Sequence, residues 1–264
     1  MPLETMTTPK HHSLNKEILS ILGDDHSKVE LVDVMSEDIA LKVVNSARIS
    51  FGTESKEYTD KDKKLASFLW NHEHSSPYRH SFYTFAISCP LFVFRQWVKY
   101  QVGSGWRSFE ADGEEISIEV FDQMFDTDKG CSWNEFSGRY AILEPQFWIP
   151  EHARVQSPTG NKQKSVRTDN PILTEDLQLL YASNQKETYQ RYEYALSIGV
   201  AKELARPLLP QNIYTHSYWT VSLQGIIHFL KQRTKEDAQE EIQSYAKAIQ
   251  SLVQEDLDRL GIEI

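Results

Sequence analysis

The change of pattern on either side of Pro90 constrains the fold more than any other feature of the sequence. Residues 81–88 (SFYTFAIS) are aromatic and β-branched, which favours a β-strand. Proline is well suited to the first turn of a helix, so the run LFVFRQWVKY at 91–100 is expected to be helical. The sequence therefore predicts a strand followed directly by a helix, with Gln96, Lys99 and Tyr100 on one helical face.

Most of the remaining pattern is helical, and Gly199 is well placed to end one of the helices. The expected elements are a strand at 29–34 and helices at 37–48, 60–72, 174–198, 200–210, 219–233 and 235–260. These elements predict a helix-rich α+β fold with a small mixed or antiparallel sheet. We expect a single catalytic domain at 29–264, preceded by an N-terminal extension at 1–28.

One segment interrupts this pattern between about residues 104 and 131. The run from Gly103 to Gly130 contains four glycines and eight acidic residues around a short apolar core, ISIEVF. Such a composition is typical of an exposed insertion. We expect this insertion to lie at the rim of a functional site, as a lid or a subunit contact.

Net charge and hydropathy exclude several classes of protein. The formal charge of −10 argues against a nucleic-acid-binding protein, which would need a basic face. No apolar run approaches the roughly 18 residues of a membrane span, so no membrane association is expected. The first residues lack the apolar core of a signal peptide. They favour a cytoplasmic protein, either bacterial or in a virus-infected host cell.

Cysteine and histidine spacing gives no sign of a disulfide framework or a metal centre. Cys89 and Cys131 are the two cysteines of the chain, and they have no metal-binding spacing. The histidine pairs at 11–12 and 72–74 lack a third ligand at suitable spacing. We therefore expect no metal site.

The stretch CSWNEFSGRY at 131–140 is rich in groups that bind anions. The Ser137 hydroxyl, a backbone N–H at Gly138 and the forked guanidinium of Arg139 together suit a phosphate dianion. The alternative is a turn in which Arg139 pairs with a surface carboxylate.

Two further arginines lie on predicted helices that are otherwise dominated by apolar residues. Arg206 and Arg233 each need an anionic partner, because a buried unpaired charge is costly. For Arg233 the alternative to a ligand is a salt bridge with Glu236 or Glu240. Gln96 offers a donor and an acceptor to a base edge, although a lone glutamine on a helix is usually solvated.

Several segments, taken together, resemble the flavin-dependent thymidylate synthases, the ThyX family. They are SARISF (46–51), HEHSSPYRH (72–80), FRQWVKYQ (94–101), SWNEFSGRY (132–140), FWIP (147–150), LARPLLPQNIYT (204–215), WTVSLQGIIHFLKQR (219–233) and DAQEEIQSYA (237–246). These segments occur in the same order as in the family, and the resemblance covers most of the chain, from about Val29 to about Leu252.

The sequence resembles a divergent member of this family, because part of the family signature is altered. The family signature R-H-R-x-x-S is followed closely by N-E-x-S-x-R, and its second half is intact at 134–139. Lys99, Tyr100 and Gln101 stand where Arg, His and Arg are expected. The insertion lies within the signature, so its first serine is either Ser104 or Ser132.

The resemblance implies a specific reaction. Such enzymes methylate dUMP to dTMP, taking one carbon from methylenetetrahydrofolate and a hydride from reduced FAD, which NADPH recharges. Four identical subunits assemble so that each active site draws on several chains, and no cysteine nucleophile is used. Two alternatives stay open, namely hydroxymethylation at C5 of a pyrimidine nucleotide and a non-catalytic nucleotide-binding paralogue.

Site residues follow from the positions that match the family. Those expected to bind dUMP are Gln96, Lys99, Glu135, Phe136, Ser137, Gly138, Arg139, Arg206 and Arg233. Arg233 is expected to be catalytic, because it faces the uracil edge and favours loss of the N3 proton. Those expected to bind FAD are Ser50, His74, Ser76, Arg79, Lys99, Tyr100, Gln101, Glu135, Ser222, Gln224 and His228.

Overall fold

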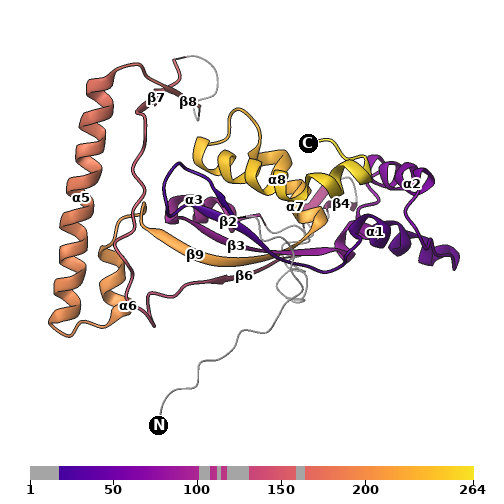
Figure 1. Ribbon diagram of the computed structural model, residues 1–264, viewed down its shortest axis with the longest axis horizontal. Helices are drawn as coiled ribbons and strands as arrows, with labels where there is room; N and C mark the ends of the chain where they lie inside the picture. The colour runs from indigo at the N-terminus through magenta and orange to yellow at the C-terminus, as the bar shows by residue number, and fades with distance from the viewer. Residues whose placement is uncertain (1–17, 101–107, 112–113, 118–130, 159–163) are drawn as a thin grey trace, which may run out of the picture.

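A five-stranded sheet forms the centre of the protein (Figure 1). The computed structural model describes residues 18–100, 108–111, 114–117, 131–158 and 164–264. The strand order is β1 (Ile18–Ser20), β2 (Lys28–Val34), β3 (Phe82–Pro90), β9 (Tyr214–Ser222) and β6 (Cys131–Glu135). Each neighbouring pair is antiparallel, so the sheet is antiparallel and not mixed.

Helices supply the other half of the main core. They are α1 (Ile39–Arg48), α2 (Asp60–Asn71), α3 (Leu91–Trp97), α7 (Leu223–Arg233) and α8 (Glu240–Leu260), with short 3₁₀ turns η1 (Ile49–Phe51) and η2 (Ser76–His80). Trp97 lies at the centre of the core, stacked on Phe229 and edge-on to Trp219 and Tyr245. The prediction of a helix-rich α+β fold is confirmed.

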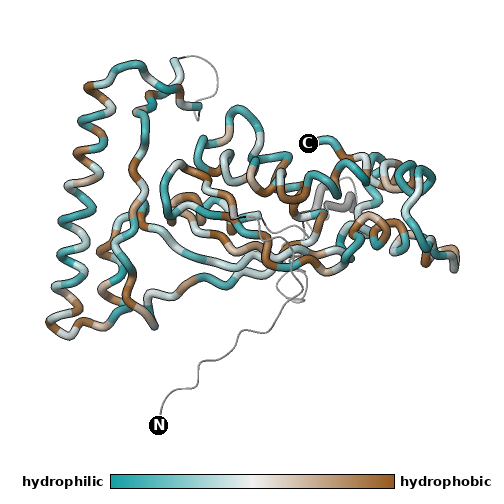
Figure 2. The backbone as a smooth tube through the Cα atoms, in the orientation of Figure 1, coloured by the Kyte–Doolittle hydropathy of each residue, from teal (hydrophilic) through white to brown (hydrophobic). Residues whose placement is uncertain are grey.

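A second, much smaller apolar cluster lies at the other end of the molecule. Helix α5 (Pro171–Ser197) stands apart from the sheet, with α6 (Lys202–Ala205) and the 3₁₀ turn η3 (Arg206–Leu208) beside it (Figure 1). Only Tyr192, Ala195 and Ala205 are buried in this cluster. Figure 2 shows hydrophobic residues along α5. Among the described residues, Leu179, Leu180 and Tyr194 of this helix are exposed.

Two short hairpins complete the described elements. Strands β4 (Ser108–Ala111) and β5 (Glu114–Ser117) pair within the predicted insertion, and β7 (Arg154–Gln156) pairs with β8 (Ser165–Arg167). The expectation that the insertion lies at the rim of a functional site, as a lid or a subunit contact, concerns residues and side chains outside those that the structure describes. None of the described helices is both long enough and apolar enough to span a bilayer.

The predicted helix at 219–233 is wrong over its first four residues. Residues 219–222 (WTVS) belong to β9, and α7 begins only at Leu223. Aromatic and β-branched side chains favour the strand, and β9 is paired on both sides, with β3 and β6. The Ser222 hydroxyl then accepts a hydrogen bond from the Gly225 N–H and so caps the helix.

Other boundaries also differ from the sequence pattern. The helix predicted at 200–210 is only the short α6 followed by η3, and α8 begins at Glu240 and not at residue 235. Helix α3 ends at Trp97, three residues before its predicted end, so Lys99 and Tyr100 lie beyond it. Residues 131–135, which were predicted only as a binding segment, form the edge strand β6. Its Trp133 stacks on Trp219, a partner that lies far away in the sequence.

Candidate functional site

Helix α7 and the segments around α3 and the start of α8 supply a set of polar residues that we call the α7 cluster: His228 and Arg233 of α7, Gln96 and Tyr100 at α3 and just after it, and Gln239 just before α8. The Arg233 guanidinium carbon lies 4.9 Å from the centre of the Tyr100 ring, a cation–π contact. The Arg233 Nε atom is buried and has no hydrogen-bond partner in the described structure. A buried donor without a partner is costly, and an acceptor on a ligand would satisfy it.

The alternative role of Arg233, an ion pair with Glu236 or Glu240, is not what the structure shows. Glu240 pairs with Arg154 and Arg167, both of which belong to the β7–β8 hairpin. Glu236 lies 4.0 Å from the Lys164 ammonium group. Both carboxylates therefore have other cationic partners.

Gln96 and His228 complete the α7 cluster. The Gln96 side chain is half-buried, and its Nε2 donates to Gln239 Oε1 at 2.6 Å, so it is not simply a solvated glutamine. The His228 ring centre lies 5.9 Å from that of Tyr100. Burial lowers the pKa of His228, which favours the neutral imidazole near pH 7.

The segment after β6 meets α6 and η3 and forms a second group, the α6 cluster: Ser137, Gly138, Arg139, Glu203 and Arg206. A Cβ atom at Gly138 would lie 3.3 Å from Arg206 Cδ and 3.0 Å from Leu143 Cδ1. These distances are tighter than ordinary van der Waals contact, so the close approach of Arg206 to this backbone favours glycine.

Arg139 lies in a turn in which the Tyr140 N–H donates to the Ser137 carbonyl at 3.0 Å. Its Nε lies 3.3 Å from a carboxylate oxygen of Glu203, and the two side chains are 56% and 53% exposed. The carboxylate contact raised as the alternative for Arg139 is therefore present. Because the pair is so exposed, it is weak enough for a doubly charged phosphate to displace Glu203.

Glu135 and Phe136 connect β6 to the α6 cluster. Glu135 accepts a hydrogen bond from the Thr215 hydroxyl at 2.8 Å, and the Phe136 N–H donates to the His216 carbonyl at 2.7 Å. Burial, and to a smaller degree the Glu135 carboxylate, raises the pKa of the fully buried Cys89 thiol. A buried neutral thiol is a poor nucleophile, which agrees with a reaction that uses no cysteine.

The two clusters lie in different parts of the chain's fold. Figure 1 shows α6 beside α5, whereas α7 lies with α8 along the sheet. Most of the residues expected to bind dUMP thus divide between the two clusters. Glu135 and Phe136 lie at the end of β6 and just after it, before the α6 cluster, and Lys99 is exposed just beyond α3.

The residues expected to bind flavin gather only in part. The loop before η2 meets the start of α7 where Gln224 Nε2 donates to the Ser75 hydroxyl at 3.0 Å. Gln224 Oε1 is buried without a partner among the described residues, so a donor on a ligand could satisfy it. His74 is exposed on the same loop and Ser76 is exposed as the first residue of η2, whereas Ser222 is buried as the cap of α7.

Other residues of that set lie further along α1 and η2. Arg79 lines a cavity of about 680 Å³ with Lys42, Asn45 and Ser46 of α1. Ser50 is exposed on η1, next to that helix. Gln101 lies outside the described residues.

Four residues that the sequence did not single out hold predicted ones in place: Ser75, Glu203, Thr215 and Gln239. Ser75 and Gln239 belong to segments that resemble the family, HEHSSPYRH and DAQEEIQSYA, and so does Thr215 at the end of LARPLLPQNIYT. Their position in these segments could have indicated these three residues, whereas nothing in the sequence indicated Glu203.

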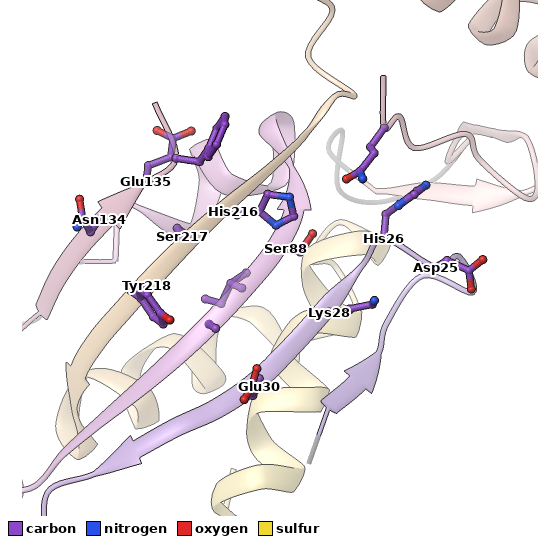
Figure 3. Close-up of a pocket in the computed structure, with 14 residues that line it drawn as sticks. Asp25, His26, Lys28, Glu30, Ser88, Asn134, Glu135, His216, Ser217 and Tyr218 are labelled. Carbon is purple, nitrogen blue, oxygen red and sulfur yellow. The ribbon is translucent and has the colours of Figure 1, made fainter. Parts of the chain in front are cut away.

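A cavity of about 560 Å³ opens on the sheet and was not predicted (Figure 3). Asn134 and Glu135 line it from β6, His216 and Tyr218 from β9, and Lys28 from β2. Glu135 thus borders this cavity while its carboxylate is held by Thr215.

Comparisons of sequence identify similar proteins over most of the chain. The family model described as "Thymidylate synthase complementing protein" matches residues 30–257. A flavin-dependent thymidylate synthase of Thermosipho africanus is 34% identical over 231 residues, covering 88% of this chain and 87% of its own length. One from Thermus thermophilus is 36% identical over 231 residues, covering 88% of this chain and 73% of its own.

Solved structures with a similar fold include the UMP/dUMP methylase PolB from Streptomyces cacaoi. Its complex with 5-Br dUMP aligns with a TM-score of 0.69 over 90% of this chain and 93% of that chain. The complex with 5-Br UMP gives a TM-score of 0.67 over 87% and 89%. At 23% sequence identity these similarities describe the fold alone.

Proposed function

Because the chain belongs to the family of flavin-dependent thymidylate synthases, we propose that it converts dUMP to dTMP by reductive methylation. In this proposal FAD carries the hydride, NADPH supplies it, and methylenetetrahydrofolate donates the carbon. The solved structures of similar fold are named UMP/dUMP methylases bound to brominated uridine nucleotides, which supports a uridine nucleotide as substrate.

The proposal rests mainly on the surroundings of the Arg233 side chain. Its guanidinium is oriented by the Tyr100 ring, and its buried Nε has no partner among the described residues. Uracil offers carbonyl oxygens at O2 and O4 that accept hydrogen bonds from such a group. We assign Arg233 to the pyrimidine edge of dUMP.

A guanidinium at that edge has a direct chemical consequence. It stabilises negative charge on the uracil oxygens and therefore favours loss of the proton from N3. The resulting anion is richer in electrons at C5, where the new carbon attaches. Because this charge grows along the reaction, the contribution of Arg233 falls on turnover more than on binding.

The α6 cluster is assigned to the phosphate of dUMP. Arg139 and Arg206 supply positive charge, while the Ser137 hydroxyl and the Gly138 backbone N–H provide hydrogen-bond donors for the phosphate oxygens. Binding of the dianion would replace the contact between Arg139 and Glu203, which is exposed and weak.

Gln224 and the loop at 74–76 are assigned to the flavin, which supplies hydride chemistry when bound. Gln224 Oε1, which is buried and has no partner in the part of the chain that the structure describes, would suit an N–H donor of the isoalloxazine ring. His228, held neutral by burial, can either donate or accept a hydrogen bond at the same face of α7.

We further propose that four copies of the chain assemble, and that one site takes its α7 cluster and its α6 cluster from different copies. Helix α5 supports this, because Leu179, Leu180 and Tyr194 are all more than 60% exposed. Phe51 is 84% exposed at another surface, on η1. Apolar residues gathered in this way are typical of subunit interfaces.

The experiment is an assay of the purified protein with dUMP, methylenetetrahydrofolate, NADPH and FAD. We expect a yellow protein with flavin absorbance that forms dTMP only when all the co-substrates are present. A product of different mass would favour hydroxymethylation instead. A protein that binds a uridine nucleotide but neither flavin nor folate would be a non-catalytic paralogue.

A further inference from the structure

The cavity on the sheet has a row of three neighbouring residues at its floor, which we call the sheet row: Lys28, Ser88 and His216. Lys28 of β2 lies opposite Ser88 of β3, and Ser88 lies opposite His216 of β9. All three line the cavity, and Figure 3 shows the Ser88 hydroxyl between the other two side chains. Residues directly opposite each other on antiparallel strands have Cβ atoms about 4.5–5.5 Å apart, so the three side chains can act on one ligand group.

The Ser88 hydroxyl is the first indication of a ligand. Ser88 is only 6% exposed, and its Oγ is buried without a hydrogen-bond partner among the described residues. Its side chain faces the cavity, because Ile87 and Cys89 on either side of it belong to the main core on the opposite face of the sheet. An unpaired buried hydroxyl is costly, and an acceptor on a ligand in the cavity would satisfy it.

Positive charge on the sheet row is the second indication. Lys28 is exposed and makes no ion pair with an acidic group in the part of the chain that the structure describes. Burial lowers the pKa of His216, and the nearby charges of His26 and Lys28 lower it further. These groups repel one another when protonated, and a bound anion would relieve the repulsion.

Acidic residues also line the cavity, but they lie to the sides of the sheet row. The Glu135 carboxylate accepts a hydrogen bond from the Thr215 hydroxyl. Glu30 lies two residues beyond Lys28 on β2, which is about 6.6 Å along the strand. Asp25 is exposed on the loop before β2. The centre of the row is therefore left to a hydroxyl, an ammonium group and an imidazole, which together suit an oxyanion.

The position of the cavity indicates which oxyanion it would take. Asn134, Glu135 and Phe136 form one of its walls, and they lead directly into Ser137, where the phosphate of dUMP is assigned. The donor of the carbon must lie next to dUMP when it reacts. Methylenetetrahydrofolate carries its reactive carbon at one end and a glutamate with two carboxylates at the other, so a site for that glutamate must lie beside the dUMP site and not within it.

We propose that Lys28, Ser88 and His216 form an oxyanion site that binds a glutamate carboxylate of methylenetetrahydrofolate. The inference rests on the proposed function, in which this folate supplies the carbon to dUMP. The sheet row holds the end of the folate that undergoes no bond change. Its contribution should therefore fall on folate affinity and KM, with kcat unchanged at saturating folate.

The test measures the affinity of the FAD-loaded, full-length protein for two ligands by calorimetry: tetrahydrofolate, and tetrahydropteroate, which lacks the glutamate. Ser88→Ala should weaken tetrahydrofolate binding about tenfold, because a hydrogen bond to a charged group is lost. Lys28→Ala should weaken it about fivefold, as expected for an exposed charge. Neither variant should change the affinity for tetrahydropteroate.

The stability of Ser88→Ala separates a binding role from a structural one. The Ser88 Oγ has no partner in the described structure, so its removal should leave the ligand-free protein at least as stable as the wild type. Thermal unfolding without ligand measures this. A variant that is clearly less stable and binds both ligands more weakly would show that Ser88 supports the sheet and is not part of a binding site.

Two variants serve as matched controls. Thr84→Val removes a hydroxyl four residues before Ser88 on the same face of β3, where Thr84 pairs with Thr220 outside the cavity. Lys61→Ala removes a positive charge from an exposed position on α2. Both should keep the wild-type affinity for tetrahydrofolate. A loss in Lys61→Ala equal to that in Lys28→Ala would reduce the role of Lys28 to an effect of net charge and overturn the assignment.

The remaining outcomes distinguish the inference from the proposed function. If Ser88→Ala and Lys28→Ala kept the wild-type affinity for tetrahydrofolate in a protein that forms dTMP, the inference would be wrong and the proposed function would stand. If both variants weakened the binding of NADPH and not of folate, the oxyanion would be a phosphate, and the assignment to folate would be wrong. If the wild-type protein bound no tetrahydrofolate, the proposed function itself would fail.

Discussion

Arg233 and Arg139 are both expected to bind dUMP, but they differ in how far the surrounding residues hold the side chain in place before a ligand binds. The Arg233 guanidinium lies on the Tyr100 ring, and its buried Nε has no partner among the described residues, while Gln96 is held by Gln239. Arg139 lies on a turn, more than half exposed, and contacts an equally exposed Glu203. The α7 cluster is therefore organised before ligand binding, whereas the α6 cluster must exchange a partner.

This difference suits the two tasks. Contacts that act on the reacting ring are most effective when they are fixed in advance, because they then need no reorganisation as charge develops. A phosphate takes no part in the bond changes, so its binding site can be open and can exchange partners. We therefore expect changes in the α6 cluster to alter affinity and changes in the α7 cluster to alter turnover.

Arg139→Ala should have the largest effect. It removes a charge-assisted contact that can be bidentate, which costs about 2–4 kcal/mol of dUMP binding, or roughly 30-fold to 1,000-fold in Kd. Calorimetric titration with dUMP measures this loss. Unchanged affinity would remove Arg139 from the phosphate site and leave only its contact with Glu203.

Arg233→Ala should lower kcat by about a hundredfold, as expected for loss of a group that stabilises the transition state. Its Kd for dUMP should stay within about tenfold of the wild type, because the phosphate contacts remain. Single-turnover kinetics together with calorimetry separate the two quantities. Near-normal turnover would mean that the buried guanidinium of Arg233 and its contact with Tyr100 stabilise the fold and do not contribute to catalysis.

Glu203→Gln should act in the opposite direction to Arg139→Ala. Removing the competing carboxylate frees Arg139, and exposed ion pairs contribute about 0.2–1 kcal/mol. We therefore expect dUMP to bind up to about fivefold more tightly. A weaker affinity for dUMP in the same titration would show that Glu203 orients Arg139 and does not compete for it.

Burial of the α7 cluster also predicts a modest pH dependence of stability. The pKa of His228 is below its ordinary value of 6.5 because of burial, so the unfolded chain takes up a proton first as the pH falls. The folded state is therefore destabilised progressively below about pH 6.5. Thermal unfolding between about pH 7.5 and pH 5.5 measures this loss. His228→Gln should reduce it, and an identical pH profile in that variant would contradict the expectation.

The strand and helix on either side of Pro90 could be predicted because their patterns are local. Strand β6 could not, because its five residues are mostly polar and its stability comes from pairing with β9, as between Trp133 and Trp219. The residues 219–222 were misassigned for a related reason. They directly precede a true apolar helix, and pairing with two other strands decides their conformation.

The candidate site shows the same limit. Family resemblance indicated Gln96, Glu135 and Arg139 residue by residue, but it assigned no role to Gln239, Thr215 or Glu203, the residues that contact them. Glu135 is held by Thr215, 80 positions away, and Gln96 by Gln239, 143 positions away. Such contacts depend on the assembled sheet and helices, and local spacing does not encode them.

The most direct test of the account mixes two variants of the whole protein. If one site combines the α7 cluster of one copy with the α6 cluster of another, Arg139→Ala and Arg233→Ala chains should complement each other. Equal amounts, dissociated and reassembled together, should regain up to about a quarter of wild-type dTMP formation, since a quarter of the sites would then carry both arginines. A mixture no more active than the separate variants would show that both clusters of a site belong to one chain.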